Sequence, residues 1–138
     1  LAARGKKRML IPPGFPASFL PANCEFVRDT ALDYREIDAT EGALTCATVA
    51  IAMTGSLVLT HSETEGRRAL TLIPDYHLCV VYTDQLYETV PEGIRALGPR
   101  RTSPVTTIAG PSATADIEMT RVKGVHGPRV LDVIIVSR

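Results

Sequence analysis

The chain has little of what marks several large classes of protein. Its 15 basic and 15 acidic residues cancel, which argues against a general nucleic-acid-binding protein, because such a protein shows a basic excess. No apolar run reaches the roughly 20 residues that a membrane-spanning helix needs. Residues 43–59 come closest, but threonines, a serine and a glycine interrupt them. No signal-peptide pattern opens the sequence, so we expect a cytoplasmic protein.

Cysteine is also scarce, and it does not occur in ligand-like pairs. Cys24, Cys46 and Cys79 are widely spaced, and each lies in an apolar run. They predict small buried side chains rather than the four thiolates of an iron–sulfur cluster or a structural zinc site. The sequence also lacks a Walker A motif, a full Gly-x-Gly-x-x-Gly fingerprint, a nucleophile elbow and His-Glu-x-x-His. We therefore expect no metal and no cofactor in this chain.

The remaining pattern alternates short apolar runs with helical periodicity, which favours a three-layer α/β sandwich with a Rossmann-like core. At 138 residues, a single domain over residues 1–138 is expected. A turn at Thr54 and Gly55 predicts a β-hairpin, so the sheet is expected to be mostly rather than purely parallel. Strands are expected at residues 8–11, 24–28, 56–60, 77–82, 106–109 and 130–136, and helices at 66–72, 84–97 and after Ser112.

Two of these elements carry further expectations. The helix over 84–97 places Leu86, Val90, Ile94 and Leu97 at three- and four-residue spacing, which is typical of a core-facing stripe. The strand over 130–136 is apolar almost throughout, which predicts a central position with both faces covered.

The run from Gly110 to Glu118 is the first candidate site. A β-rich stretch leads into Gly110-Pro111-Ser112, and small residues then open a predicted helix with Thr114 and Asp116 in its first turn. A strand, a tight turn and a helix N-terminus together present backbone N–H groups to an anion. The alternative is an ordinary N-cap, in which the Ser112 hydroxyl only completes a short helix.

A second loop follows closely and can converge on the same place. His126 stands between Gly124 and Gly127, and Pro128 follows. An imidazole with small neighbours can face a cleft, and its ordinary pKa near neutrality suits proton transfer or anion binding. The alternative is a loop histidine that is hydrogen-bonded to the backbone.

The third set of candidates lies earlier in the chain. Thr54, Gly55 and Ser56 form the hairpin turn, and Arg67 and Arg68 open the predicted helix over 66–72. An arginine there can clamp a carboxylate or phosphate through two hydrogen bonds. The pattern favours one functional arginine, without deciding which, and the alternative is one surface arginine and one structural ion pair. His77 is interpreted as structural, and His61 carries no signal.

Four segments, taken in this order, resemble the lactate utilisation protein C family (LutC/YkgG, the LUD domain). They are Ala50–Ser56, Glu65–Val81, Gly110–Glu118 and Gly124–Pro128. The resemblance runs from about Thr45 to the C-terminus, and the N-terminal helical region of family members is not found upstream of it. It implies a fold like the NagB/RpiA/CoA-transferase group. It also implies a bacterial cytoplasmic protein that works with iron–sulfur partner proteins in the oxidation of L-lactate to pyruvate.

This resemblance leaves the role of the chain itself open. The family commonly has an acidic residue where Met53 stands here, so no general base is assigned at that position. The leading hypothesis is a subunit without iron–sulfur clusters that binds a small anionic ligand. The alternatives are a stand-alone enzyme like a CoA-transferase or sugar-phosphate isomerase, with Asp116 or His126 as acid or base, and a regulatory ligand-binding module. A homo-oligomer is a further possibility.

Overall fold

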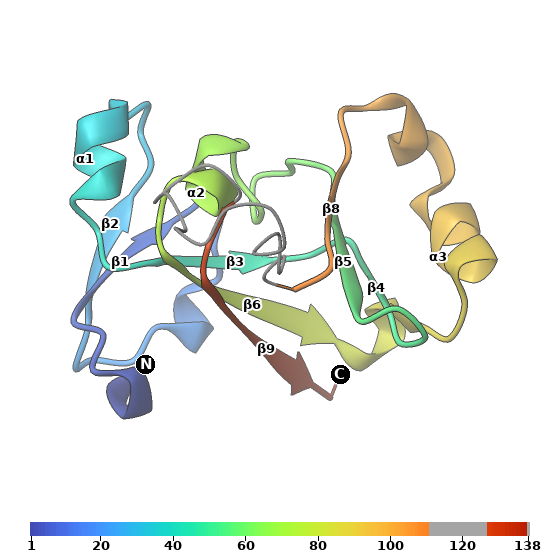
Figure 1. Cartoon of the computed structure of the whole chain (residues 1–138), viewed down its shortest axis with the longest axis horizontal. Helices are drawn as coiled ribbons and strands as arrows, with labels where there is room; N and C mark the ends of the chain where they lie inside the picture. Colours follow the sequence, from blue (N-terminus) through green and yellow to red (C-terminus); the bar gives the residue numbers. More distant parts are fainter. Residues whose placement is uncertain (111–126, 138) are drawn as a thin grey trace, which may run out of the picture.

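The computed structural model describes residues 1–110 and 127–137, and its centre is a sheet of five parallel strands (Figure 1). Every pairing in this sheet is parallel, and the longest runs between the last two strands, from Tyr76 beside Val130 to Tyr82 beside Val136. In spatial order the strands are β2 (Glu25–Arg28), β1 (Arg8–Ile11), β3 (Ala43–Cys46), β6 (Tyr76–Tyr82) and β9 (Val130–Val136).

A second, smaller sheet contains the predicted hairpin. Strands β4 (Val49–Ile51) and β5 (Ser56–Leu59) are antiparallel, which confirms the turn at Thr54 and Gly55. Strand β8 (Thr106–Ile108) adds antiparallel to β5, and β7 (Leu86–Tyr87) adds parallel to β4. The expected mixed α/β fold with a mostly parallel arrangement is thus confirmed, with the hairpin in a sheet of its own.

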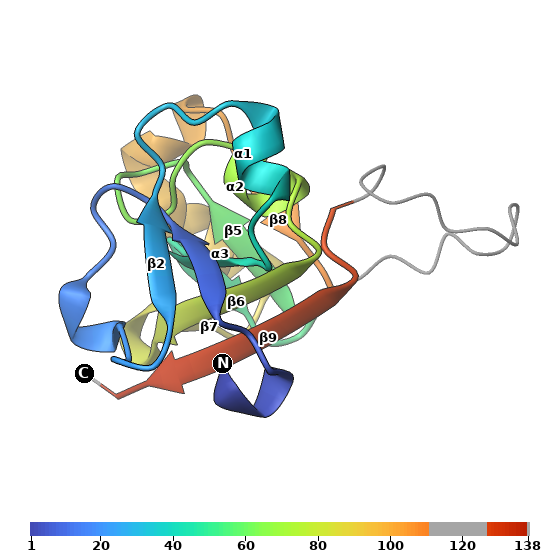
Figure 2. The ribbon, with the colours of Figure 1, turned by 90° about the vertical axis from the view of Figure 1, so that its left-hand side faces the viewer.

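The two faces of the five-stranded sheet are covered differently. On one face, helices α1 (Tyr34–Asp38) and α2 (Ala69–Leu72) cover β1 and β3, and the second sheet packs over β6. On the other face, the sheet is covered by the N-terminal segments, which include the 3₁₀ turns η1 (Ala2–Arg4) and η2 (Ala17–Phe19) (Figure 2). None of the described helices is long and apolar enough to cross a bilayer.

Helix α3 (Val90–Leu97) lies on the outer face of the second sheet and is shorter than predicted. The expectation of a helix over 84–97 was wrong at its start, because residues 83–85 form the 3₁₀ turn η3 and residues 86–87 form β7. Thr89 caps α3 in a capping box with Glu92. The 3₁₀ turn η4 (Gly98–Thr102) follows the helix.

Of the predicted core stripe of this helix, only Leu97 is buried. Leu86, Val90 and Ile94 are exposed, and it is Gly93 and Leu97 that face the sheet. A Cβ on Gly93 would lie 2.8 Å from Cγ1 of Ile51. The absence of a side chain therefore lets the helix backbone approach the sheet closely, and this turns the stripe outward.

The prediction of a central position for the strand over 130–136 was wrong. Strand β9 is the last strand in the sheet order, and no described residue pairs with its outer side. Its side chains at Val133, Ile134 and Ile135 are 44%, 47% and 55% exposed. A continuous apolar run is compatible with a buried strand, but it does not show whether other strands pair with both of its edges.

Candidate anion-binding site

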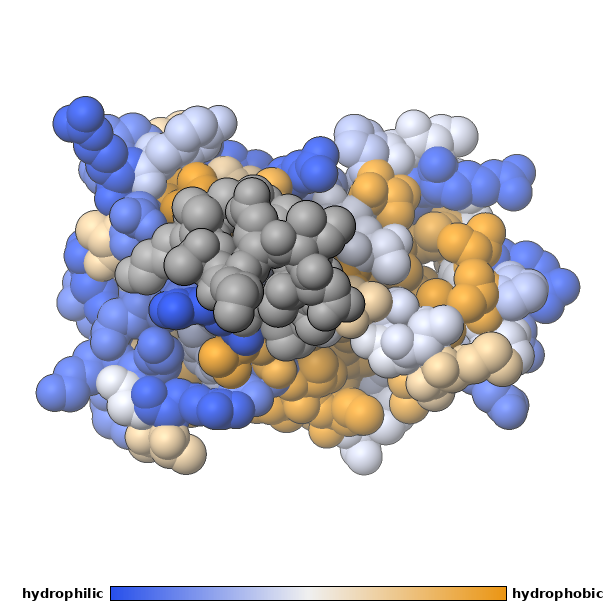
Figure 3. Space-filling model, in the orientation of Figure 1, coloured by the Kyte–Doolittle hydropathy of each residue, from blue (hydrophilic) through white to orange (hydrophobic). Residues whose placement is uncertain are grey.

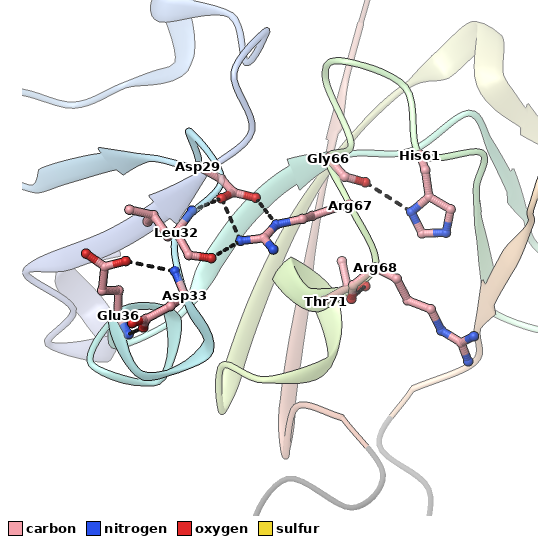
Figure 4. Close-up of polar contacts among 9 residues, drawn as sticks. All are labelled: Asp29, Leu32, Asp33, Glu36, His61, Gly66, Arg67, Arg68 and Thr71. Carbon is pink, nitrogen blue, oxygen red and sulfur yellow. Dashed lines mark hydrogen bonds and ion pairs between the residues drawn. The ribbon is translucent and has the colours of Figure 1, made fainter.

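The loop of residues 60–68, which we call the β5–α2 loop, joins β5 to α2 and carries both predicted arginines (Figure 4). Arg67 forms a bidentate ion pair with Asp29, with Nε 2.6 Å from Oδ2 and Nη2 2.9 Å from Oδ1. Its Nη2 also donates to the Leu32 carbonyl. The Asp29 side chain is only 4% exposed. Hydrogen bonding to this carboxylate raises the pKa of Arg67, so Arg67 is committed to an internal ion pair.

Both arginines are exposed, but Arg68 differs from its neighbour in its partners. It is exposed, and among the described residues its guanidinium has no hydrogen-bond or ion-pair partner. Its carbonyl accepts a hydrogen bond from the Thr71 hydroxyl at 3.2 Å, which fixes the backbone beside α2. Its side chain points away from Asp29 (Figure 4). Of the two arginines, Arg68 is therefore the one available to a ligand.

Glu65 lies in the same loop, and its side chain is buried beneath the loop backbone with only 2% of the residue exposed. Its carboxylate accepts from the Thr60 amide at 2.7 Å and the Ser62 amide at 3.1 Å. It also accepts from the hydroxyls of Thr60 and Thr48. Sequence reasoning missed Glu65. The only signal was a carboxylate in a hydroxyl-rich stretch, and Glu63 shares that signal.

His61 ties the loop to the second sheet, and sequence reasoning missed this residue as well. Its Nδ1 lies 3.0 Å from the Gly66 carbonyl and its Nε2 lies 2.9 Å from Oγ1 of Thr106 on β8. Because a carbonyl only accepts, Nδ1 carries the proton, and in the neutral ring Nε2 accepts from the Thr106 hydroxyl. His61 has φ 59°, a left-handed conformation that a non-glycine residue adopts rarely.

The hairpin candidates lie away from Arg68. Thr54, Gly55 and Ser56 are at the start of β5, whereas the β5–α2 loop follows its end. The four-residue strand between them is roughly 13 Å long at the usual rise per residue. Gly55 has φ 62°, as the turn requires, and the Thr54 hydroxyl donates to Oγ of Ser56 at 2.8 Å. The structure therefore does not bring these residues together with the arginines.

The first described stretch ends at Gly110, and the second begins at Gly127. The two stretches meet the undescribed residues on the same side of the molecule (Figure 2). A Cβ on Gly127 would lie 3.6 Å from the Thr71 carbonyl oxygen, so this glycine sits against α2. Strand β8 ends two residues before Gly110, where Ile108 pairs with Leu57. The other predicted site residues lie outside the described part of the chain, namely Ser112, Thr114, Asp116, Gly124 and His126.

His77 lies within the core rather than at this site. It is fully buried, its Nε2 is 2.7 Å from Oγ1 of Thr45, and its Nδ1 has no hydrogen-bond partner in the part of the chain that the structure describes. Burial lowers the pKa of His77 to about 4, so the ring is neutral at physiological pH. Among the described residues, no group of three or more His, Cys, Asp or Glu side chains is placed to hold a metal ion.

Comparison with known proteins identifies the family. The LUD domain model matches residues 28–136. The chain belongs to the LUD domain family. A curated relative, "Lactate utilization protein C" of Deinococcus radiodurans, is 47% identical over 134 residues, which are 95% of this chain and 63% of the relative. A second, from Halalkalibacterium halodurans, has the same name and is 33% identical over 80% of this chain and 52% of its own length.

A solved structure supports the fold of this LUD domain. The crystal structure of a DUF162 family protein from Deinococcus radiodurans matches 99% of this chain and 80% of that chain, with a TM-score of 0.82 and 38% sequence identity. The curated relatives are longer proteins, and the LUD domain described here spans about half to two thirds of the two named above.

Proposed function

We propose that this LUD domain serves lactate utilisation as a component without iron–sulfur clusters that binds a small anion through Arg68. Family membership and the relatives called "Lactate utilization protein C" support the lactate role. Electron transfer is assigned to iron–sulfur partner proteins, and the proposed place of action is the cytoplasm.

The observation that carries the anion site is the contrast between two adjacent arginines. Asp29 neutralises the charge of Arg67, whereas no described residue neutralises that of Arg68. A guanidinium offers a planar fork of donors that matches a carboxylate or a phosphate. The fixed backbone of the β5–α2 loop limits the entropy lost when such an anion binds.

Growth on L-lactate as sole carbon source tests this proposal. A strain that lacks the gene and any second lactate dehydrogenase is complemented with the wild-type gene, an Arg68→Ala variant or an Arg100→Ala variant. Arg100 is an exposed arginine in η4 and serves as the matched control. We expect wild type and Arg100→Ala to restore growth and Arg68→Ala to fail at equal protein level. Full growth with Arg68→Ala would contradict the anion site, and growth without any copy would contradict the lactate role.

The loops that the structure does not describe are tested in the same strain. A Ser112→Ala, Asp116→Ala, His126→Ala triple variant is expected to fail as well, because the sequence predicts that these residues belong to the anion site. Restored growth with the triple variant would limit the site to the β5–α2 loop.

A further inference from the structure

We propose that Glu65 is a positioning residue, whose buried carboxylate fixes the β5–α2 loop so that Arg68 is held ready for its ligand. The predicted effect of Glu65 on binding rests on the proposed function, because it requires that Arg68 binds an anion. The inference concerns a residue that does not touch the ligand and acts only through the loop that it organises.

The Glu65 carboxylate accepts four hydrogen bonds. Its Oε2 accepts from the amides of Thr60 and Ser62 and from the Thr60 hydroxyl, and its Oε1 accepts from the Thr48 hydroxyl. Amide N–H groups can only donate, so Oε2 is the acceptor in both amide contacts. No described lysine or arginine pairs with this carboxylate. Among the described residues, its partners are therefore neutral donors alone.

These contacts close the loop on itself and attach it to the sheet. The amides of Glu65 and Gly66 both donate to the Ser62 carbonyl, at 3.0 and 2.8 Å. Gly66 has φ 74°, and a Cβ there would lie 2.7 Å from Cδ2 of Leu70, so the chain turns tightly just before the arginines. Thr48 lies between β3 and β4, and through it the carboxylate joins the loop to the framework of both sheets.

Arg68 lies three residues after Glu65, so the fixed backbone of the loop also fixes the position of its Cα atom. The remaining anchors act on neighbouring residues, since His61 holds the Gly66 carbonyl and Asp29 holds the Arg67 guanidinium. Loss of the carboxylate frees the amides of Thr60 and Ser62 and lets the loop explore other conformations. A guanidinium on a mobile loop binds more weakly, because binding must then order the loop.

Two substitutions at one position separate positioning from charge. In Glu65→Gln the amide oxygen can take the place of Oε2, and the amide nitrogen can donate to Thr48, so most of the network survives. In Glu65→Ala every contact is lost. Thr48→Val removes only the hydroxyl that reaches Oε1 and is the milder variant if Glu65→Ala does not fold.

The experiment combines calorimetric titration with hydrogen exchange on the whole chain, using L-lactate and inorganic phosphate as probes. For the probe that wild type binds, we expect Glu65→Ala to raise Kd at least about tenfold and Glu65→Gln to stay within about threefold. Thr48→Val is expected to lie between them. An unchanged Kd in Glu65→Ala, or a Kd in Glu65→Gln as poor as in Glu65→Ala, would overturn the proposal.

Hydrogen exchange distinguishes failure of this inference from failure of the proposed function. If wild type binds neither probe, the anion site fails, and the loop amides still report on Glu65. We expect exchange in residues 60–68 to accelerate at least about tenfold in Glu65→Ala, with β6 unchanged and Glu65→Gln close to wild type. Equal acceleration in the loop and in β6, or none in the loop, would contradict a positioning role.

Discussion

The β5–α2 loop and the edge strand β9 present opposite kinds of surface. In the loop, Glu65, His61 and Arg67 all have partners, whereas two charged groups, the Glu63 carboxylate and the Arg68 guanidinium, are left without a described partner. Along β9 the exposed groups are apolar, and hydrophobic atoms gather over this strand (Figure 3). Many hydrogen bonds fix the backbone of the loop that carries the Arg68 cation. Such a fixed cation is typical of a ligand-binding site, so we propose the ligand site here.

The two edge strands of the five-stranded sheet, β2 and β9, also differ in length and in charge. Strand β2 is four residues long and carries Glu25 and Arg28 at its ends, which is a usual protection of an edge. Strand β9 is seven residues long, and its one charged residue, Asp132, is bound by Arg4 and Tyr76 of the same chain. Hydrophobicity alone therefore does not show which strand of a sheet is central.

The largest effect on stability is expected from the loop. Glu65→Ala leaves two amides without their acceptor and opens space beneath the loop, which we expect to cost about 4 kcal/mol in the free energy of unfolding. Urea denaturation at pH 7 measures it. Glu65→Gln is the matched control and is expected to cost about 1 kcal/mol, so equal losses in the two variants would contradict the role given to the acceptor geometry.

Buried His77 predicts a specific dependence of stability on pH. Its pKa is lowered to about 4 in the folded protein, against about 6.5 when unfolded. Between these pH values the unfolded chain binds more protons than the folded chain. The contribution of neutral His77 to the free energy of unfolding is therefore fully present above pH 6.5. It is lost as the pH falls toward 4, by about 3 kcal/mol in total. Urea denaturation at pH 7 and pH 5 tests this. His77→Gln serves as the reference and should show the smaller decrease, and parallel curves for both proteins would refute the assignment.

The ion pair of Arg67 is expected to matter for folding rather than for ligand binding. Arg67→Ala leaves the Asp29 carboxylate nearly buried without its cation, which we expect to cost about 2 kcal/mol. At a temperature where the variant is fully folded, the Kd for the anion should change little. Thermal unfolding together with calorimetric titration checks both points, and a large loss of binding without a loss of stability would reverse the roles of the two arginines.

The smallest effect is expected at the edge strand, and the same substitution on two neighbouring strands reveals it. Val81 on β6 is fully buried, whereas Val133 on β9 is 44% exposed. Placing a hydroxyl in the core at Val81→Thr is expected to cost about 2 kcal/mol, and Val133→Thr less than about 0.5 kcal/mol. Equal costs, measured by urea denaturation, would show that β9 is covered in solution.

The sequence predicts local features better than it predicts neighbours. The hairpin at Thr54 and Gly55 follows from turn chemistry, and β6 follows from a strongly apolar run. Helix α1 was missed because Asp33 and Glu36 cap a single short turn within a polar stretch. The edge position of β9 and the outward stripe of α3 depend on tertiary contacts, such as the close approach at Gly93.

For the candidate site, the sequence could indicate that one arginine is functional but could not say which. The choice depends on Asp29, which lies 38 residues earlier in the chain and reaches only Arg67. Glu65 and His61 were missed for a related reason, because their importance lies in backbone groups that have no signature in the sequence.

The most direct test of the account is a calorimetric titration of L-lactate and inorganic phosphate into wild type, Arg68→Ala and Arg100→Ala. The account predicts saturable binding of at least one anion by wild type and by Arg100→Ala, with Kd raised at least about tenfold in Arg68→Ala. Equal affinity in Arg68→Ala and wild type would contradict it.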